Sequence, residues 1–207
     1  MKRMIPFFMA AAALLSVGLV ASLALGRDPK GGLRDAKSFD SISDRGQRSV
    51  ALFEEAGKVI QNPRCMNCHP AGDRPSQGAD MHPHNPPVVR GDGMGATGMQ
   101  CVTCHLDANT PIKTASIHSV PGNPEWRLAP IALAWQGKSL GDICREIKDP
   151  RRNGGKDLVK LHEFMAKDEL VAWGWNPGDG RDPVPGTQAQ FGEIIQAWID
   201  TGAVCPG

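Results

Sequence analysis

The chain has 207 residues with a formal net charge of +1, and 41% of its residues are hydrophobic and 22% charged. This length suits one domain or two very small ones, and the near-neutral charge excludes the basic surface that nucleic-acid-binding proteins need. Aromatic residues make up only 5%, tyrosine is absent, and 24 glycines and 17 prolines predict a loop-rich protein with a thin side-chain core.

Residues 1–26 predict an export signal. Lys2 and Arg3 supply a positive start, an apolar run of about 20 residues follows, and small residues allow cleavage after Ala24 or Gly26. The apolar run is also just long enough to remain as a membrane-spanning anchor. Both alternatives place the rest of the chain outside the cytoplasm, in the periplasm. Cleavage would remove Lys2 and Arg3 from the 23 basic residues, leaving 21 against 22 acidic ones.

Composition divides the remainder of the chain. Residues 27–40 are rich in Gly, Lys and Asp and predict a linker. Residues 41–207 are expected to form one domain, in which 41–125 carry two cysteine motifs and 126–207 form a helical C-terminal part.

The first element expected in this domain is a helix. Apolar residues recur at helical spacing over 50–60, and Ser41 or Ser43 is a candidate N-cap. Asn62-Pro63 ends the helix and leads directly into the first cysteine pair.

The next segment, 62–125, has little helix or strand periodicity and is dominated by Pro, Gly, His and Asp. A stretch of this length without regular elements is unusual in a compact domain unless it wraps a cofactor. Three further helices are predicted over 139–148, 156–173 and 187–200, and no strand is predicted. The expected fold class is therefore mainly α and loop-rich, with few helices and no substantial sheet.

Four of the six cysteines fall in two copies of the motif C-x-x-C-H. The residues are Cys65, Cys68 and His69 in the first copy, and Cys101, Cys104 and His105 in the second. This spacing is typical of c-type haem attachment, in which two thiols add across the vinyl groups of one porphyrin edge. The histidine is then held under the iron as its proximal ligand. The motifs therefore predict two covalently bound haem c groups in a cytochrome c-like dihaem domain.

Two other interpretations explain less of this pattern. The two cysteine pairs also fit a tetrahedral zinc site, but zinc gives no reason for a histidine directly after each second cysteine. A thioredoxin-like dithiol needs a single pair in a βαβ context, which this sequence lacks. Haem attachment accounts for all six residues and is the preferred interpretation.

The second axial ligand of each iron is sought among the remaining histidines and methionines. His82 and His84 lie between the motifs and flank Pro83, which restricts the backbone. In an extended stretch these two side chains point in different directions, so they can serve two irons. They are the first candidates, against the alternative of a solvated polar loop. A methionine ligand raises the reduction potential of the iron, whereas a bis-histidine site generally has a lower reduction potential.

Three methionines are alternative distal ligands. Met94 and Met99 lie shortly before the second motif, and their simpler role is packing against a porphyrin face. Met165 lies three residues after His162 on a predicted helix, and amphipathic spacing favours a place in the helix core. His118 lies in a loop and is expected to be exposed.

Two cysteines lie outside the motifs. Cys144 and Cys205 are expected to form a disulfide in an oxidising compartment, with two buried free thiols as the alternative. Such a bridge would stabilise the fold by about 3 kcal/mol. Five tryptophans in the second half are expected to pack the helices and cover haem edges. They are Trp126, Trp135, Trp173, Trp175 and Trp198.

Five segments together resemble the dihaem cytochromes c known as isoquinoline 1-oxidoreductase subunits. The segments are NPRCMNCHPAGDRP, HPHNPPVVRG, GMQCVTCH, LAWQGKSLGDIC and LVAWGWNPGDGR. The resemblance extends from Asn62 to Cys205, nearly all of the expected mature chain. It implies that the chain accepts electrons from a molybdenum hydroxylase and passes them towards the respiratory chain. No molybdopterin site is recognisable in the sequence, so the implied role is that of an accessory subunit.

The leading functional hypothesis is an electron-transfer protein that works with a redox partner protein and has no catalytic residues. Two haems close in sequence, without a catalytic triad or acid/base dyad, favour it. The alternative is a small dihaem enzyme such as a peroxidase, with His162 and Glu163 as a distal acid/base pair. A haem-based sensor ranks last because no output domain is recognisable. Four haem propionates would add negative charge near the haem edges, so docking should weaken with salt.

Overall fold

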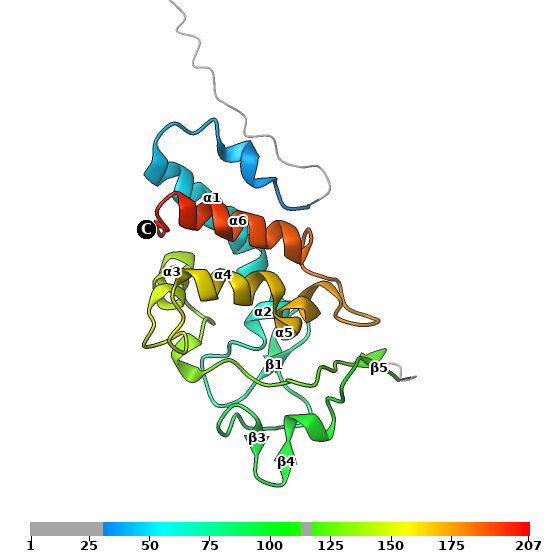
Figure 1. The fold of residues 1–207 in the computed structure, drawn as a ribbon. Coiled ribbons are helices and arrows are strands. Elements are labelled where there is room, and N and C mark those ends of the chain that lie inside the picture. Colours follow the sequence, from blue (N-terminus) through cyan, green and yellow to red (C-terminus); the bar gives the residue numbers. More distant parts are fainter. Residues whose placement is uncertain (1–30, 113–116) are drawn as a thin grey trace, which may run out of the picture.

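The computed structural model describes residues 31–112 and 117–207, so the predicted signal at 1–26 lies outside the described residues. Figure 1 shows two parts: longer helices pack together in the upper part, and loops with short hairpins form the lower part. In the upper part α1 (Arg45–Ile60) lies beside α6 (Gln188–Asp200), and α4 (Leu158–Lys167) packs against α6.

Regular structure in the described ranges is mainly helical. The remaining helical elements are α2 (Pro63–Met66), α3 (Leu140–Lys148), α5 (Glu169–Ala172), and the 3-10 turns η1 (Ala36–Phe39), η2 (Cys101–Thr103), η3 (Ile131–Leu133) and η4 (Trp173–Trp175). The strands form three antiparallel pairs, β1 (Ser76–Gln77) with β2 (His82–Pro83), β3 (Gly95–Ala96) with β4 (Met99–Gln100), and β5 (Thr110–Pro111) with β6 (Ser119–Val120). A mainly α, loop-rich fold without a substantial sheet is confirmed. The three hairpins were not predicted, because strands of two residues are too short to show alternation.

Helix α1 is capped by Asp44 and not by Ser41 or Ser43. The Asp44 carboxylate accepts a hydrogen bond from the backbone N–H of Gln47 at 2.7 Å. A carboxylate here satisfies a helix donor and also interacts favourably with the positive end of the helix dipole. The predicted helix is confirmed, and its first turn precedes the apolar stretch.

The helix predicted over 156–173 is interrupted at one residue. Asp168 has an extended backbone, with φ −64° and ψ 135°, so α4 ends before it and α5 begins after it. Its carboxylate accepts hydrogen bonds from the N–H groups of Leu170 at 2.9 Å and Val171 at 3.1 Å. The apolar pattern continues across this break, which is why the sequence predicted a single helix.

Helices α3 and α6 confirm the predicted ranges, and each begins at a side-chain cap. The hydroxyl of Ser139 accepts a hydrogen bond from the N–H of Asp142 at 3.1 Å. At the start of α6, Thr187 accepts from the N–H of Gln190 while the Gln190 side chain accepts from the N–H of Thr187, both at 3.1 Å. This reciprocal pair is a capping box, which satisfies two helix donors at once.

The hydrophobic core lies among α1, α4 and α6. Trp198 and Phe53 are fully buried there, with ring centroids 4.8 Å apart. Full burial of a large apolar side chain contributes about 1.5–3 kcal/mol. Part of the segment predicted as a linker joins this core, because Leu33 and Phe39 are buried against it.

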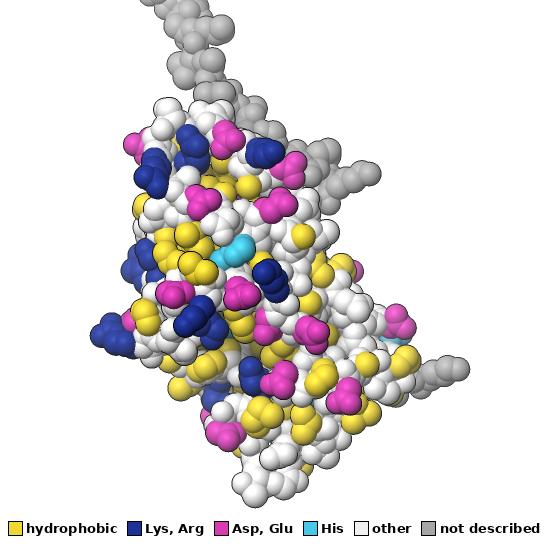
Figure 2. Space-filling view, in the orientation of Figure 1, with side chains coloured by type: hydrophobic (Ala, Val, Ile, Leu, Met, Phe, Trp, Pro, Cys, Tyr) yellow, Lys and Arg dark blue, Asp and Glu magenta, His cyan; other side chains and the backbone are white. Residues whose placement is uncertain are grey.

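Charges of both signs occur together on one face of the described chain. Figure 2 shows Lys and Arg side chains interspersed with Asp and Glu over the visible face. Of the helices in residues 31–112 and 117–207, none has both the length and the apolar character that a bilayer span requires.

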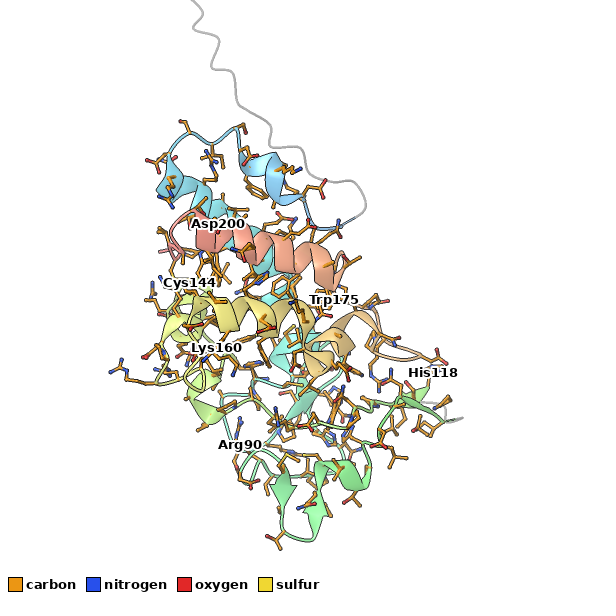
Figure 3. The ribbon with its side chains drawn as sticks, viewed as in Figure 1. Arg90, His118, Cys144, Lys160, Trp175 and Asp200 are labelled. Atoms are coloured by element: carbon orange, nitrogen blue, oxygen red, sulfur yellow. A yellow bond between two sulfur atoms is a disulfide. The ribbon has the colours of Figure 1, made fainter. Side chains whose placement is uncertain are left out.

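The predicted disulfide between Cys144 and Cys205 is confirmed, with the two Cα atoms 5.6 Å apart. Cys144 lies on α3, and Figure 3 places it near Asp200 at the end of α6. The bridge therefore ties the C-terminal tail to α3. A further contact reinforces it, since the Arg145 guanidinium donates to the carbonyl of Pro206 at 3.3 Å.

Candidate functional site

The first C-x-x-C-H motif begins in the short helix α2. Asn62 caps this helix by accepting a hydrogen bond from the N–H of Arg64 at 2.9 Å, and Pro63 occupies the first helical position, where no donor is needed. The turn continues through the motif, because the N–H of Cys68 donates to the carbonyl of Cys65 at 3.1 Å. Local backbone structure thus places both thiols on one turn.

A distant segment of the chain closes over this motif. The N–H of Ala129 donates to the carbonyl of Cys68 at 3.0 Å, and the N–H of Trp135 donates to the carbonyl of His69 at 2.9 Å. The Nδ1 atom of His69 lies 2.7 Å from the carbonyl oxygen of Leu133. Because a carbonyl can only accept, Nδ1 carries the proton and the lone pair of Nε2 is available for a metal.

The second motif repeats this arrangement on the 3-10 turn η2. The N–H of Cys101 donates to the carbonyl of Met94 at 2.8 Å, and the N–H of His105 donates to the carbonyl of Cys101 at 2.9 Å. The Nδ1 atom of His105 lies 2.8 Å from the carbonyl oxygen of Pro121. The proton is again on Nδ1, so both motif histidines have the same tautomer and an available Nε2.

Burial favours the neutral form of both motif histidines. It lowers the pKa of His69 to about 4, against the opposing effect of the hydrogen bond to Leu133, and the charge of Arg90 lowers it further. The pKa of His105 is also lowered, first by burial. A neutral imidazole is the form that ligates a metal ion.

A tryptophan stacks on each motif histidine. The rings of Trp135 and His69 are nearly parallel, with centroids 3.4 Å apart and 9° between their planes. Trp126 lies on His105 at 4.6 Å and 12°, and Trp173 meets Trp126 edge-on at 5.0 Å. These contacts fix the plane of each imidazole, which is how neighbours orient a metal ligand.

Burial disfavours the thiolate form of both cysteines in the first motif. Burial raises the pKa of Cys65 to about 12 and that of Cys68 to about 11, with smaller contributions from neighbouring cysteines. Redox-active dithiols have lowered thiol pKa values, so this environment is the opposite of theirs. Backbone hydrogen bonds bring the motifs together, because the N–H of Ala129 donates to the carbonyl of Cys68 at 3.0 Å and the N–H of Leu128 donates to the carbonyl of Gly93, shortly before the second motif, at 2.9 Å. Within the described ranges, no three His, Cys, Asp or Glu side chains gather as a ligand set for a metal ion.

Arg90 joins the loops around the first motif. Its guanidinium donates to the carbonyls of Pro70 at 3.0 Å, of Gly72 at 3.1 Å and of Ala129. Figure 3 shows it among the loops of the lower part. Burial lowers its pKa, while the charge of Asp73 opposes this effect, and an arginine remains charged in either case. Arg90 thus links the loop after the motif to the segment that covers it.

Three buried N–H donors near the first motif have no acceptor in the described part of the chain. They are Nε of Arg64, Nε of Arg90 and Nε1 of Trp135. One acceptor, Oδ1 of Asn67, is also unpaired. An unpaired buried polar group costs about 1–3 kcal/mol, so such a cluster points to a missing partner. Haem carries two propionate groups, and this set of donors suits a carboxylate ligand.

The two histidines between the motifs have different partners. His82 is exposed, and both of its ring nitrogens are engaged: Nδ1 donates to Asp80 at 2.6 Å and Nε2 accepts from the amide of Gln77 at 3.0 Å. His84 is partly buried, and its ring centroid lies 5.9 Å from that of His105. The structure therefore brings His84, and not His82, to the second motif.

The other candidate ligands lie in different environments. Met99 is 51% exposed on β4, whereas Met94 is partly buried in the glycine-rich loop before it. Met165 is buried in the helical core, as its spacing indicated. His118 is exposed, as expected, and Figure 3 places it at the edge of the molecule.

The residues considered as a peroxidase-type acid/base pair lie on α4. Glu163 is exposed and forms an ion pair with Lys167 at 3.8 Å. His162 faces α6, since a side-chain carbon added to Gly192 would lie 3.9 Å from its Nε2 atom. Both residues thus have their contacts within the helical part of the protein.

An open pocket of about 450 Å³ lies beside the second motif. It is lined by Val102, His105 and the loop residues 106–111. Cofactor and ligand pockets commonly have volumes of about 300–1,000 Å³. The second motif therefore has space beside its histidine, whereas the first motif offers unpaired donors.

The motif spacing predicts the six candidate residues but not the groups that orient them. The carbonyls of Leu133 and Pro121 lie 64 and 16 residues from the histidines that they bind. A backbone acceptor can belong to any residue type, so it cannot be recognised from the sequence. Arg64 and Arg90 were missed because most arginines are exposed, and nothing in their neighbours indicates burial.

Comparison of the chain with protein-family models, with curated proteins and with solved structures finds no match in any of the three.

Proposed function

We propose that this chain is a dihaem c-type cytochrome that transfers electrons and is not itself an enzyme. The observation that carries the proposal is the same arrangement at both C-x-x-C-H motifs. In each motif the histidine Nδ1 donates to a backbone carbonyl, at 2.7 Å in the first and 2.8 Å in the second, and leaves Nε2 available. A histidine held in this way is a fixed metal ligand.

Each motif would attach one haem through its own residues. His69 and His105 are the proximal ligands, and their hydrogen-bonded Nδ1 atoms set the orientation of each ring. Haem c, when bound, supplies an iron that gains and loses one electron. The thioether bonds come from four cysteines, which are Cys65, Cys68, Cys101 and Cys104.

Buried donors would bind the acidic groups of the first haem. Arg64 and Arg90 are each only 7% exposed, and both have an unpaired Nε. Asp182 and Asp73 interact electrostatically with these guanidinium groups, but neither accepts a hydrogen bond from Nε, and a propionate would supply that acceptor. Trp135 adds a neutral donor beside His69. These residues support haem binding independently of the cysteine spacing.

The closeness of the motifs supports electron transfer within one chain. The neighbouring residues Leu128 and Ala129 hydrogen-bond to Gly93, shortly before the second motif, and to Cys68 of the first motif. Attachment points this close would keep the two haem groups near each other, which favours rapid exchange of an electron. The helices α1, α4 and α6 would then form the rigid part of a cytochrome c-like domain, with the haem groups in the loop-rich part.

Location and partner are inferred from the sequence and the disulfide. The basic and apolar start of the chain supports export to the periplasm, and the Cys144–Cys205 bridge suits an oxidising compartment. The resemblance to isoquinoline 1-oxidoreductase subunits supports a dehydrogenase such as a molybdenum hydroxylase as the electron donor. The electrons would then pass towards the respiratory chain.

Haem content tests this proposal directly. Protein purified from a host that matures c-type cytochromes should be red, with the mass of the polypeptide plus two haem groups. The double variants Cys65→Ser/Cys68→Ser and Cys101→Ser/Cys104→Ser should each retain one haem. The matched control is Cys144→Ser/Cys205→Ser, which removes the disulfide and should retain both. A colourless protein, or one that binds zinc in place of haem, would contradict the proposal.

A further inference from the structure

His84 lies next to the histidine of the second motif. The centroids of the His84 and His105 rings are 5.9 Å apart, and their planes are inclined by 60°. His84 is partly buried, although it belongs to a proline-rich loop whose other residues are largely exposed. The contact between the two rings therefore links the proline-rich loop to the second motif.

Both rings use Nδ1 in a hydrogen bond and leave Nε2 as the nitrogen that could bind a metal. The Nδ1 atom of His84 donates to the carbonyl of Pro86 at 2.9 Å, just as Nδ1 of His105 donates to Pro121. The proton of each neutral ring is therefore on Nδ1, and each Nε2 has a lone pair. His82 differs, because its Nε2 already accepts a hydrogen bond from Gln77.

The separation of the rings matches that of two ligands on one metal ion. With metal–nitrogen bonds of about 2.0 Å, two imidazoles on opposite sides of an ion have ring centroids about 6 Å apart. From the ring separation and the matching tautomers we propose that His84 is the distal ligand of the iron whose proximal ligand is His105. This inference rests on the proposed function, and it makes the second haem a six-coordinate, bis-histidine centre.

The loop that carries His84 is fixed to the chain following the first motif. The N–H of His84 donates to the carbonyl of Pro75 at 2.9 Å, and the Arg74 guanidinium donates to the carbonyl of His84 at 2.7 Å. The N–H of Asn85 donates to the side chain of Gln77 at 3.1 Å. These three bonds hold the backbone on both sides of the imidazole, so His84 is a pre-positioned ligand.

The same loop connects the two haem sites. The N–H of Ser76 donates to the carbonyl of Asn67 within the first motif at 3.4 Å, and the Ser76 hydroxyl accepts from Gln136 at 2.6 Å. Gln136 directly follows Trp135, which stacks on His69. The segment 74–77, which holds the backbone around His84, therefore also contacts the first motif through Ser76.

A bis-histidine site has clear chemical consequences. Both axial positions are filled by the protein, so carbon monoxide and peroxide have no open position on that iron. The potential of such a site generally lies below that of a histidine–methionine site. The second haem would thus carry electrons without binding small molecules.

Replacement of His84 tests the proposal, and replacement of His82 is the matched control. In the wild type, reduced protein should show no carbon monoxide binding at the second haem. His84→Ala should retain two covalent haem groups, convert one of them to a high-spin form and bind about one more carbon monoxide per chain than the wild type. His82→Ala should leave the spin state and carbon monoxide binding unchanged. Unchanged low-spin spectra in His84→Ala, or equal effects of both replacements, would overturn the assignment.

A second variant covers the case in which His84→Ala does not mature. His84→Met should restore six-coordination, and near-infrared magnetic circular dichroism should then show one histidine–methionine centre with a raised potential. A His84→Met protein whose spectra and potentials equal those of the wild type would overturn the proposal. Haem content is measured first in every sample. Wild type without covalent haem contradicts the proposed function, whereas full haem content with unaltered spectra contradicts only the role of His84.

Discussion

The two C-x-x-C-H motifs have the same local design but different surroundings. In the first, α2 buries Met66, and distant amides donate to the carbonyls of Cys68 and His69. In the second, η2 has no buried residue and Cys104 is exposed. The first site is thus enclosed by the protein, and the second lies open on a loop.

The comparison separates two properties of a haem site: the motif determines how the haem is attached, and the surrounding residues determine its reduction potential. Attachment chemistry depends on the five residues of each motif, which are local in sequence. Burial, hydrogen bonding and solvent exposure tune the potential of a haem, and at these sites they come from distant residues. We therefore expect two haem groups with distinct potentials and distinct responses to substitution.

Removing the disulfide should have the largest effect on stability, and it should weaken the first site more than the second. The bridge closes a separation of 61 residues, and loss of such a link costs about 3–4 kcal/mol. It anchors α3, which begins five residues after Trp135. The free energy of unfolding of Cys144→Ala/Cys205→Ala, measured by chemical denaturation, should fall by this amount while haem content stays at two.

Hydrogen exchange then compares the two sites within that variant. The amide of Trp135, which donates to His69, should lose more protection than the amide of Gly122, which donates to Asn109 beside the second motif. The reason is that subglobal unfolding follows the segment that loses its anchor. Equal loss of protection at both amides would contradict the expectation that α3 stabilises the first site more than the second.

Arg90→Met should have the next largest effect and should also act on the first site. The change removes three hydrogen bonds from a charged donor to carbonyl groups around the first motif. We expect the free energy of unfolding to fall by about 2–3 kcal/mol and the potential of one haem to change. Arg127→Met is the matched control, because Arg127 is exposed and forms an ion pair with the nearby Glu125, which is worth about 0–1 kcal/mol. Equal destabilisation by both changes would contradict a special role for Arg90.

The sequence predicted the helices well where a cap and an amphipathic run coincide. Ser139 and Thr187 each begin a helix close to the expected residue. The prediction was wrong at Asp168, because a carboxylate that caps a new turn cannot be distinguished from one on an exposed helix face. Asp44 was missed as a cap because two serines nearby were equally acceptable by residue type.

For the candidate site, the sequence predicted the local part and not the long-range part. Cys65, Cys68 and His69 lie within five consecutive residues, so the motif can be recognised from the sequence alone. The approach of His84 to His105 depends on how a loop of some twenty residues folds back, and no pattern encodes this. His82 and His84 are equivalent in sequence, and the structure separates them by burial, by hydrogen-bond partners and by the contact of His84 with His105.

The smallest predicted effect compares the tryptophans that stack on the two motif histidines. Trp135→Phe keeps an aromatic ring beside His69 but removes the buried Nε1–H, which has no acceptor in the described chain. Under the proposed function, a propionate of the first haem would be its acceptor. Losing the donor leaves more negative charge near the iron, which favours the oxidised state and lowers the potential.

The expected shift is on the order of tens of millivolts at one haem only, as read from a two-step spectroelectrochemical titration. Trp126→Phe is the matched control, because Trp126 stacks more loosely on His105, at 4.6 Å, and its indole is only partly buried. That change should leave both potentials nearly unaltered. A larger shift in Trp126→Phe than in Trp135→Phe would reverse the comparison, since it would mean that the open site depends more on its tryptophan than the enclosed site does.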